Sequence, residues 1–255
     1  MAATGDGGFA LAFRPRLESE SRNAALSLAA NLAIAEALLK AGTGLFRVMA
    51  EPNDFAVARL RQTAAALRLD WPKAMPLADF ERGLRASEPD QAAMMLAVRR
   101  AGQGASYKGI VAGEVPWHSA MAASYVHATA PLRRLADRYV VMAALSVANG
   151  QRVPEAVVAA FAKLPKVMAR ADALSGQIER GVIDLAEAVM LAGREGEVFD
   201  AVVTDEDERG VRIQLEAEPV VTRVVAHKVE PGSRLRVKLV AADVVKRTVA
   251  FQRFT

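Results

Sequence analysis

The stretch S-Y-V-H-A-T-A-P-L-R-R-L-A-D-R-Y, from Ser124 to Tyr139, decides how the first part of this chain is expected to fold. In its first half, Tyr125, His127 and Thr129 alternate with small apolar residues, as in a strand that gathers polar groups on one face. Pro131 has its φ fixed near the helical value and lacks an N–H, so it suits the first position of a helix. The sequence therefore predicts a strand that leads directly into a helix.

Two arginines, Arg133 and Arg134, stand in the expected first turn of that helix. Cations at this position oppose the partial positive charge of the helix N-terminus, so they are favourable only if an anion binds there. Free amides of the first turn, the Thr129 hydroxyl and two guanidinium forks would together hold a phosphodiester. The alternative is local: Arg133 pairs with Asp137 one turn later, and Arg134 faces solvent. Both alternatives remain open at this level.

The same residues carry a family resemblance. Y-V-H-A-T-A-P-L-R-R-L-A-D resembles the Y-A-H-x-T-S-P-I-R-R-Y-x-D signature of the RNB domain of the ribonuclease II / ribonuclease R family, with Ala130 in place of serine and Leu135 in place of tyrosine. His118-Ser119-Ala120 resembles the family's H-F-G segment, and Gly44-Leu45-Phe46-Arg47 resembles its L-F-R strand. In order and spacing, the resemblance covers most of Leu17 to Leu191.

The resemblance implies a magnesium-dependent exoribonuclease that degrades single-stranded RNA from its 3′ end. In that family an arginine of the P-x-R-R segment faces the scissile phosphate, which makes Arg133 first and Arg134 second the candidate catalytic residues. Tyr125, His127 and Thr129 become the candidate RNA- and phosphate-binding residues, by stacking or by hydrogen bonds to the backbone.

The family's metal site has no counterpart in this sequence. Its magnesium is held by an aspartate cluster of the type D-x-x-D-x-D-D, and no such segment occurs here. The one dense acidic run, Asp205 to Glu208, lies in an expected turn of the tail and is interpreted as solvated. The absence of cysteine excludes thiolate sites, and three histidines make a histidine-rich zinc site unexpected. We therefore expect no metal ligands in this chain.

The periodicity changes near Gly193. Helical patterns dominate before it, with expected helices near 19–40, 54–67, 76–86, 89–101, 154–162 and 166–191 and expected strands at 9–14, 45–49 and 107–112. After it come five alternating runs, at 198–203, 210–215, 220–225, 234–240 and 247–251. The sequence therefore predicts an α+β protein: residues 1–192 form the mainly helical C-terminal portion of an RNB domain, and 193–255 form a five-stranded OB-like β-barrel.

Charge separates these two parts. The net charge is +4, but from Ala192 onward 11 basic residues match 11 acidic ones, so the excess lies in the first part. An anionic partner is therefore expected there. The tail has only Phe199, Phe251 and Phe254 as aromatic residues, so we expect a barrel that is more structural than RNA-gripping. No signal peptide and no bilayer-spanning run occurs, which predicts a cytoplasmic protein without a membrane partner.

Three functional interpretations follow. The first is an RNB-family exoribonuclease represented by an incomplete chain, which is either a truncated gene product or one half of a two-chain enzyme whose partner carries the aspartates. Alternatively, the chain is a non-catalytic module that binds single-stranded RNA, or an inert remnant of such an enzyme. In each case, this chain alone is expected to be inactive as a nuclease, because its sequence lacks the metal ligands.

Overall fold

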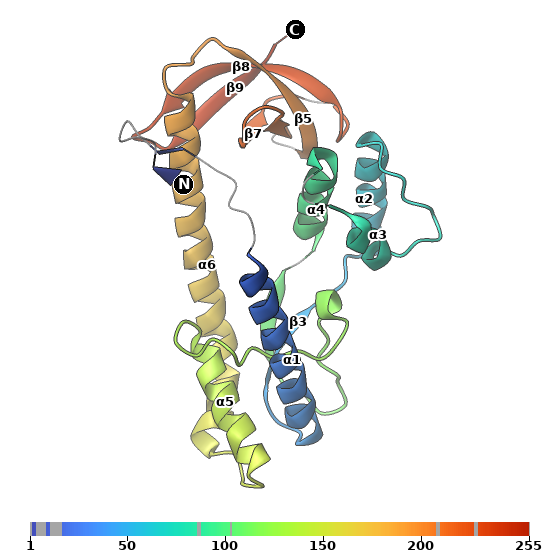
Figure 1. Cartoon of the computed structure of the whole chain (residues 1–255), viewed down its shortest axis with the longest axis vertical. Helices are drawn as coiled ribbons and strands as arrows, with labels where there is room; N and C mark the ends of the chain where they lie inside the picture. Colours follow the sequence, from blue (N-terminus) through green and yellow to red (C-terminus); the bar gives the residue numbers. More distant parts are fainter. Residues whose placement is uncertain are drawn as a thin grey trace. The chain divides into compact units, whose positions relative to one another are not determined.

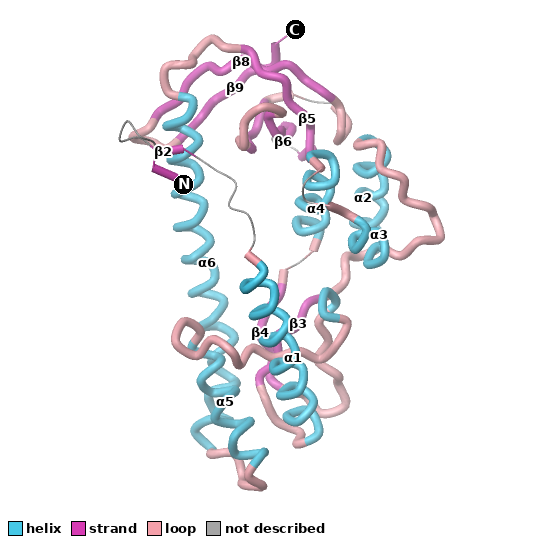
Figure 2. Tube along the Cα trace, viewed as in Figure 1, coloured by secondary structure: helices cyan, strands magenta, loops and turns pink. Residues whose placement is uncertain are grey.

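The computed structural model describes residues 2–3, 9–10, 17–85, 88–102, 104–207, 210–226 and 229–254 (Figures 1 and 2). The chain divides into two compact units. We call Arg14–Glu51 with Gly102–Gly176 the signature unit, because it contains the Ser124–Tyr139 stretch. We call Met1–Phe13 with Pro52–Ala101 and Gln177–Thr255 the barrel unit. These units interleave along the chain, and the sequence domains 1–192 and 193–255 stay a prediction.

The signature unit is built on helix α1 (Glu18–Lys40), the antiparallel strands β3 (Leu45–Met49) and β4 (Ala105–Gly109), and helix α5 (Leu135–Ala148). The chain reverses between α1 and β3 through Gly44, whose φ of +129° suits glycine alone. A Cβ there would also press on Leu38 and Phe46 at 3.1–3.3 Å. The fully buried core residues come from α1, β3, α5 and the segment before α5, namely Ala35, Leu38, Leu45, Phe46, Val126, Val140 and Ala143.

The predicted strand-to-helix turn is wrong in its geometry. Residues 124–129 belong to no strand; within them only Tyr125 forms an isolated bridge, with Arg47, and Thr129 lies in a bend. The helix begins at Leu135, with Arg134 as its N-cap. The N–H groups of residues 133 and 134 both donate to the Ala130 carbonyl oxygen, which closes a tight turn before the helix. Arg133 and Arg134 therefore lie outside the first helical turn, and the argument from opposed helix dipoles does not apply to them.

Helix α6 (Glu155–Leu191) is one element of 37 residues where two helices were predicted, with Pro165 inside it (Figure 2). Proline removes one backbone hydrogen bond and normally ends or kinks a helix. Phe161, Leu164 and Met168 flank it in the core of the signature unit, so tertiary packing on both sides of the proline offsets the loss. At its other end, Leu191 is buried in the core of the barrel.

The C-terminal strands form the predicted five-stranded antiparallel barrel (Figure 1). They are β5 (Val198–Asp207), β6 (Gly210–Leu215), β7 (Val221–Val224), β8 (Arg234–Asp243) and β9 (Thr248–Phe254). Their order is β7-β6-β5-β8-β9, and β7 also approaches β9, so the sheet nearly closes. Its core is aliphatic apart from two phenylalanines, with Ala201, Val203, Val211, Ile213, Val220, Val237 and Leu239 fully buried. The predicted α+β class is confirmed.

The barrel unit also contains α2 (Asp54–Ala66), α3 (Leu77–Gly83) and α4 (Pro89–Ala101), together with the short pair β1 (Ala2–Ala3) and β2 (Phe9–Ala10). Residues 11–14 of the predicted first strand lie outside the described residues. Trp71 stacks on Phe80 at 4.4 Å between ring centroids and anchors a separate helical core. Within the described part of the chain, no helix is long and apolar enough to cross a membrane.

Candidate nucleic-acid interface

A single buried amide organises the signature segment. Asn31 on α1 is 2% exposed. Its Oδ1 accepts a hydrogen bond from the backbone N–H of Ala128 at 2.9 Å, and its Nδ2 donates to Tyr125 Oη at 3.0 Å. The same Nδ2 lies 3.5 Å from Thr129 Oγ1. Because a buried amide is stable only when its polar atoms are paired, Asn31 and the segment 125–129 hold each other in place.

Aromatic rings gather beside this segment on the two sides of Arg47. Tyr107 lies opposite Arg47 in the β3–β4 pairing, and Tyr125 lies opposite it in the isolated bridge. The Arg47 guanidinium is 4.6 Å from the centroid of the Tyr107 ring, a cation–π contact. His127 lies edge-on to both tyrosine rings, at 5.8 Å from Tyr107 and 5.4 Å from Tyr125. Tyr107 Oη and His127 Nδ1 are 2.9 Å apart.

The second arginine of the signature is fixed by a buried carboxylate. Arg134 Nε donates to Asp137 Oδ1 at 2.8 Å, and its Nη2 donates to Oδ2 at 2.7 Å. Asp137 is fully buried and also accepts the backbone N–H of Ala130 at 2.8 Å. The Arg134 side chain is 18% exposed, so its guanidinium is held at the surface in one orientation. The bidentate fork uses Nε and Nη2, which leaves Nη1 for another acceptor.

The predicted local pair of Arg133 with Asp137 is therefore wrong, because Asp137 pairs with Arg134. Arg133 is exposed, and its side chain makes no hydrogen bond or ion pair with the described residues. Thr129 is exposed as well, and its hydroxyl faces Asn31 rather than the amides of the helix. The two arginines of the signature thus differ sharply: one is fixed and charge-compensated, and the other is not.

Burial sets the protonation of the ring cluster. The pKa of His127 falls from 6.5 to about 4, first because burial disfavours the imidazolium and then because the Arg134 cation is close. Burial raises the pKa of Tyr107, so its phenol stays protonated. His118 is 5% exposed and edge-on to Tyr125 at 5.6 Å, and burial lowers its pKa too. All three groups are neutral near pH 7.

The residues of this site thus come from α1, β3, β4 and the signature segment with the start of α5. Tyr125, His127, Thr129 and Arg134 of the prediction lie in one neighbourhood, whereas Arg133 has no described contact with the others. Sequence reasoning missed Asn31 and Tyr107 as members of the site. The available signal for Asn31 was its position as the one strongly polar residue in the apolar run A-A-N-L-A-I-A of α1.

The residues present do not fit a magnesium ion. Among the described residues, no group of three or more histidine or acidic side chains lies close enough to hold a metal. In the signature unit, Asp137 is occupied by Arg134 and a backbone amide, and Asp172 pairs with Arg47 at 3.4 Å. Magnesium prefers several oxygen ligands, of which one or two are usually carboxylates free to coordinate it. We therefore derive no metal-dependent step from this chain.

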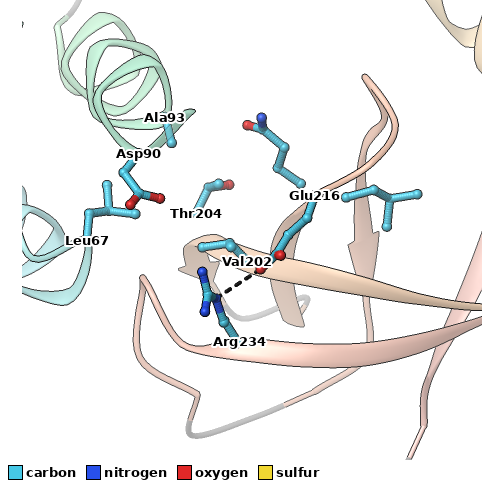
Figure 3. Close-up of a pocket in the computed structure, with 9 residues that line it drawn as sticks. Leu67, Asp90, Ala93, Val202, Thr204, Glu216 and Arg234 are labelled. Carbon is cyan, nitrogen blue, oxygen red and sulfur yellow. Dashed lines mark ion pairs between the residues drawn. The ribbon is translucent and has the colours of Figure 1, made fainter. Parts of the chain in front are cut away.

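A cavity lies in the barrel unit, and none of the predicted site residues lines it. Its volume is about 270 Å³, and it is lined by Leu67, Asp90, Ala93, Val202, Thr204, Gln214, Leu215, Glu216 and Arg234 (Figure 3). An ion pair of 3.0 Å joins Arg234 Nε to Glu216 Oε1 at its edge. Gln214 Oε1 is buried without a described partner. The lining mixes apolar side chains with one ion pair and the Asp90 carboxylate, and this combination identifies no ligand.

Comparison with known proteins places this fold. Residues 197–254 match the family of the RNase II-type exonuclease C-terminal S1 domain. No curated protein matches the chain by sequence. Among solved structures, RNase R of Mycoplasma genitalium in complex with ribose-methylated single-stranded RNA matches with a TM-score of 0.77 and 15% identity, over 96% of this chain and 43% of that chain.

Two more distant structures share the fold. Dss1 exoribonuclease of Candida glabrata, as an active-site mutant, matches with a TM-score of 0.62 and 13% identity, over 93% of this chain and 29% of that chain. Yeast Ssd1, a pseudonuclease, matches with a TM-score of 0.60 and 15% identity, over 88% and 29%. The predicted resemblance to RNB-type ribonucleases with a C-terminal barrel is thereby confirmed at the level of the fold. The chain spans less than half the length of RNase R.

Proposed function

We propose that this chain is the RNA-binding part of an RNB-type 3′–5′ exoribonuclease acting on single-stranded RNA, with the metal-binding carboxylates supplied from outside its described residues. The observation that carries the proposal is the convergence of a fixed guanidinium, Arg134, with the ring cluster of Tyr107, Tyr125 and His127. The two tyrosine rings are buried, so they support the groups that an RNA strand can reach, namely the Arg134 guanidinium and the half-buried His127 ring, rather than stacking on bases themselves. The S1-type barrel and the RNA-bound RNase R structure support this assignment.

The two signature arginines have different roles in this proposal, because a carboxylate compensates the charge of one and not of the other. Asp137 compensates the charge of Arg134, so Arg134 offers mainly direction, through its remaining Nη1 donors. Asp172 likewise compensates Arg47. Arg133 has no acidic partner among the described residues, so it supplies uncompensated positive charge for a phosphate. We assign Arg133 the main electrostatic contact, and Arg134 the oriented contact to the same or the next phosphate.

The first half of α1 is the surface on which we propose that a further segment packs. No residue from 18 to 30 is buried, although this segment contains A-A-L-S-L-A-A, and Leu26 is 72% exposed. The second half of the same helix is buried through Ala35 and Leu38. Contiguous exposed apolar surface of this kind marks an interaction site. We propose that the aspartate-bearing half packs on this part of α1, from a longer chain or from a partner chain.

A non-catalytic RNA-binding module is the second candidate. Among the described residues, no three acidic or histidine side chains are grouped so that they could hold a metal, which favours this candidate, and the shared fold includes Ssd1, a pseudonuclease. This candidate uses the same RNA contacts but needs no second half. The inert remnant is the third interpretation, and it differs from both in predicting no RNA affinity.

The test is a titration of the purified chain into a labelled, unstructured single-stranded RNA at two salt concentrations, followed by incubation with magnesium. We expect salt-sensitive binding without release of nucleotide monophosphates. Release that a chelator abolishes would reveal a metal site and overturn the assignment of this chain as the binding part alone. Absence of RNA binding at low salt would exclude both RNA-binding candidates and favour the inert remnant.

The second half is tested by adding a separately expressed aspartate-bearing segment of an RNB domain. Restored magnesium-dependent degradation supports the exoribonuclease, and binding without restoration supports the non-catalytic module. Leu26→Glu should prevent restoration by placing a charge on the exposed face of α1. Leu145→Glu is the matched control, because Leu145 is a similarly exposed leucine on α5. Equal restoration of RNA degradation by both variants would contradict the assignment of α1 as the docking surface.

A further inference from the structure

The contact between Tyr107 and His127 decides which imidazole nitrogen carries the proton. Tyr107 Oη and His127 Nδ1 are 2.9 Å apart, and either atom could donate. If Nδ1 donated, the phenol O–H of Tyr107 would need a different acceptor, and the described residues provide none. Tyr107 is buried, so an unpaired hydroxyl hydrogen would be unfavourable. If the phenol donates, both groups are satisfied by one bond.

Resting on the proposed RNA-binding function, we propose that Tyr107 holds His127 as the Nε2–H tautomer, so that His127 is a fixed neutral hydrogen-bond donor to an oxygen of a ribose–phosphate strand. Nδ1 is then occupied as an acceptor, and Nε2 carries the only imidazole N–H. Nε2 makes no hydrogen bond with the described residues and is not sealed in the interior. Tyr107 is a positioning residue in this arrangement, and His127 is a binding residue.

The surroundings of His127 favour the neutral ring over a proton-transferring base. The charged and titratable groups facing it are Arg134 and Asp137 on the α5 side, Arg47 on β3, and His118 beside Tyr125. Two arginines against one carboxylate oppose a third positive charge on the imidazole, and burial acts in the same direction. A ring that stays neutral down to about pH 4 is a poor base near pH 7, but it remains a donor throughout.

A donor at Nε2 matters because phosphate and ribose present mainly acceptor oxygens. The other tautomer would direct a nitrogen lone pair at those oxygens, which is repulsive. In general, a hydrogen bond to one imidazole nitrogen fixes the tautomer, and the tautomer sets whether the other nitrogen donates or accepts. Tyr107→Phe keeps the ring and its packing against Arg47 and removes only the hydroxyl. It therefore releases the tautomer without removing an aromatic side chain.

The experiment is a long-range ¹⁵N–¹H correlation spectrum of the full chain, which reports the protonation of each nitrogen in its three histidines. His127→Gln assigns the signal. We expect a protonated Nε2 and an unprotonated Nδ1 for His127, unchanged between pH 5 and 8. In Tyr107→Phe, we expect a mixture of tautomers. Tyr139→Phe is the matched control, since Tyr139 is a half-buried tyrosine of the same unit with no described hydroxyl partner.

RNA affinity measured on the same variants tests the donor role. Tyr107→Phe should weaken binding about three- to tenfold, the loss of one oriented hydrogen bond, while Tyr139→Phe should leave it unchanged. Repeating the titration with DNA of the same sequence identifies the oxygen that accepts the hydrogen bond. An equal loss of affinity for RNA and DNA indicates a phosphate oxygen, and a loss for RNA alone indicates the 2′-hydroxyl.

The outcomes distinguish this inference from the function on which it rests. A protonated Nδ1 in the wild-type spectrum overturns the tautomer, whatever the RNA affinity. Equal RNA affinity of wild type and Tyr107→Phe overturns the donor role while RNA binding stands. Absence of RNA binding by the wild type overturns the proposed function and the donor role together, and the spectrum still decides the tautomer.

Discussion

In the C-terminal barrel, alternating residues of five strands bury an aliphatic core, with Ile213, Val237 and Leu239 fully enclosed. Around the signature segment, by contrast, several buried groups are polar: Asn31, His118 and Asp137 are each at most 5% exposed. The barrel tolerates any side chain of suitable size and polarity at most core positions. The signature segment depends on particular donors and acceptors: the Asn31 amide and the Asp137 carboxylate bind specific partners, whereas His118 Nδ1 is buried without a described one.

This difference predicts where single substitutions act. In the barrel, a substitution should change stability in proportion to the volume removed and leave RNA binding alone. In the signature unit, a substitution should change stability and binding together, or binding alone, depending on whether the group is buried. The following four predictions test the signature side of this contrast, from the largest expected effect to the smallest.

Asp137→Ala should have the largest effect on folding. It removes the buried acceptor of two guanidinium hydrogen bonds and of the Ala130 N–H, and it leaves Arg134 without its counterion. Breaking a buried pair from one side lowers the free energy of unfolding by about 3–5 kcal/mol, which urea denaturation would measure. Asp79→Ala, which breaks an exposed pair with Arg82, is the control with an effect near zero. Similar values for the two variants would contradict the role of Asp137.

Asn31→Ala should come second. Its loss leaves the buried Ala128 N–H without an acceptor and releases Tyr125 Oη, which together should lower the free energy of unfolding by about 2–3 kcal/mol. Asn149→Ala, which removes an exposed bond to the Leu145 carbonyl oxygen, should have a much smaller effect. Because Asn31 orders residues 125–129, RNA affinity of the folded variant should fall as well. A loss of stability with unchanged RNA affinity would show that the order of residues 125–129 does not matter for RNA binding.

Arg133→Ala should weaken binding of single-stranded RNA by about 1.5–3 kcal/mol without lowering thermal stability, because Arg133 has no described partner in the fold. Arg99→Ala, at an exposed arginine of α4, should change affinity little. Arg133→Lys should restore only part of the loss, since ammonium keeps the charge but not the fork. The salt dependence should also become shallower for Arg133→Ala. Equal affinities for wild type and Arg133→Ala would exclude the phosphate contact.

The pH dependence should be the smallest effect. The pKa of His127 is about 4 in the fold against 6.5 for an unperturbed histidine, so between these values the unfolded chain binds more protons. The contribution of His127 to stability is therefore complete above about pH 6.5 and is lost as the pH falls toward 4. Chemical denaturation at pH 7 and pH 5 should show this loss in the wild type and a smaller one in His127→Gln. Identical losses would assign the pH dependence to other groups.

Local sequence patterns were sufficient for most of the fold. Asn53 caps α2 through a bond from the Ala56 N–H to its side chain, as the Asn53-Asp54 pair indicated, and the five strands of the barrel follow the alternating runs. Helix α4 begins and ends at the predicted residues, Pro89 and Ala101. These elements depend on residues within a few positions of each other. Propensity, capping and alternation therefore describe them well.

The failures described here arise where burial in the folded unit overrides a local sequence signal. Separate helices were predicted at 154–162 and 166–191, but core packing of Phe161 and Met168 carries α6 across Pro165 between them. Pro131 indicated a helix start, but the buried carboxylate of Asp137 binds the Ala130 N–H and Arg134, so the helix begins four residues later, at Leu135. A local pattern does not show whether Asp137 pairs with Arg133 or with Arg134. The choice depends on how the carboxylate is buried, because a buried ion pair is stable only in a favourable geometry.

The sequence by itself determined the class of fold, the barrel and the neighbourhood of residues 125–134 as the place where an anionic strand is expected to bind. Only the tertiary structure decided how that neighbourhood is built. It brought Asn31 from α1, Arg47 from β3 and Tyr107 from β4 to a segment far along the chain. It also separated Arg134, fixed by a buried carboxylate, from Arg133, which keeps an uncompensated charge. The physical reason is that hydrogen-bond partners of a buried group are chosen by packing, and packing is a property of the whole unit.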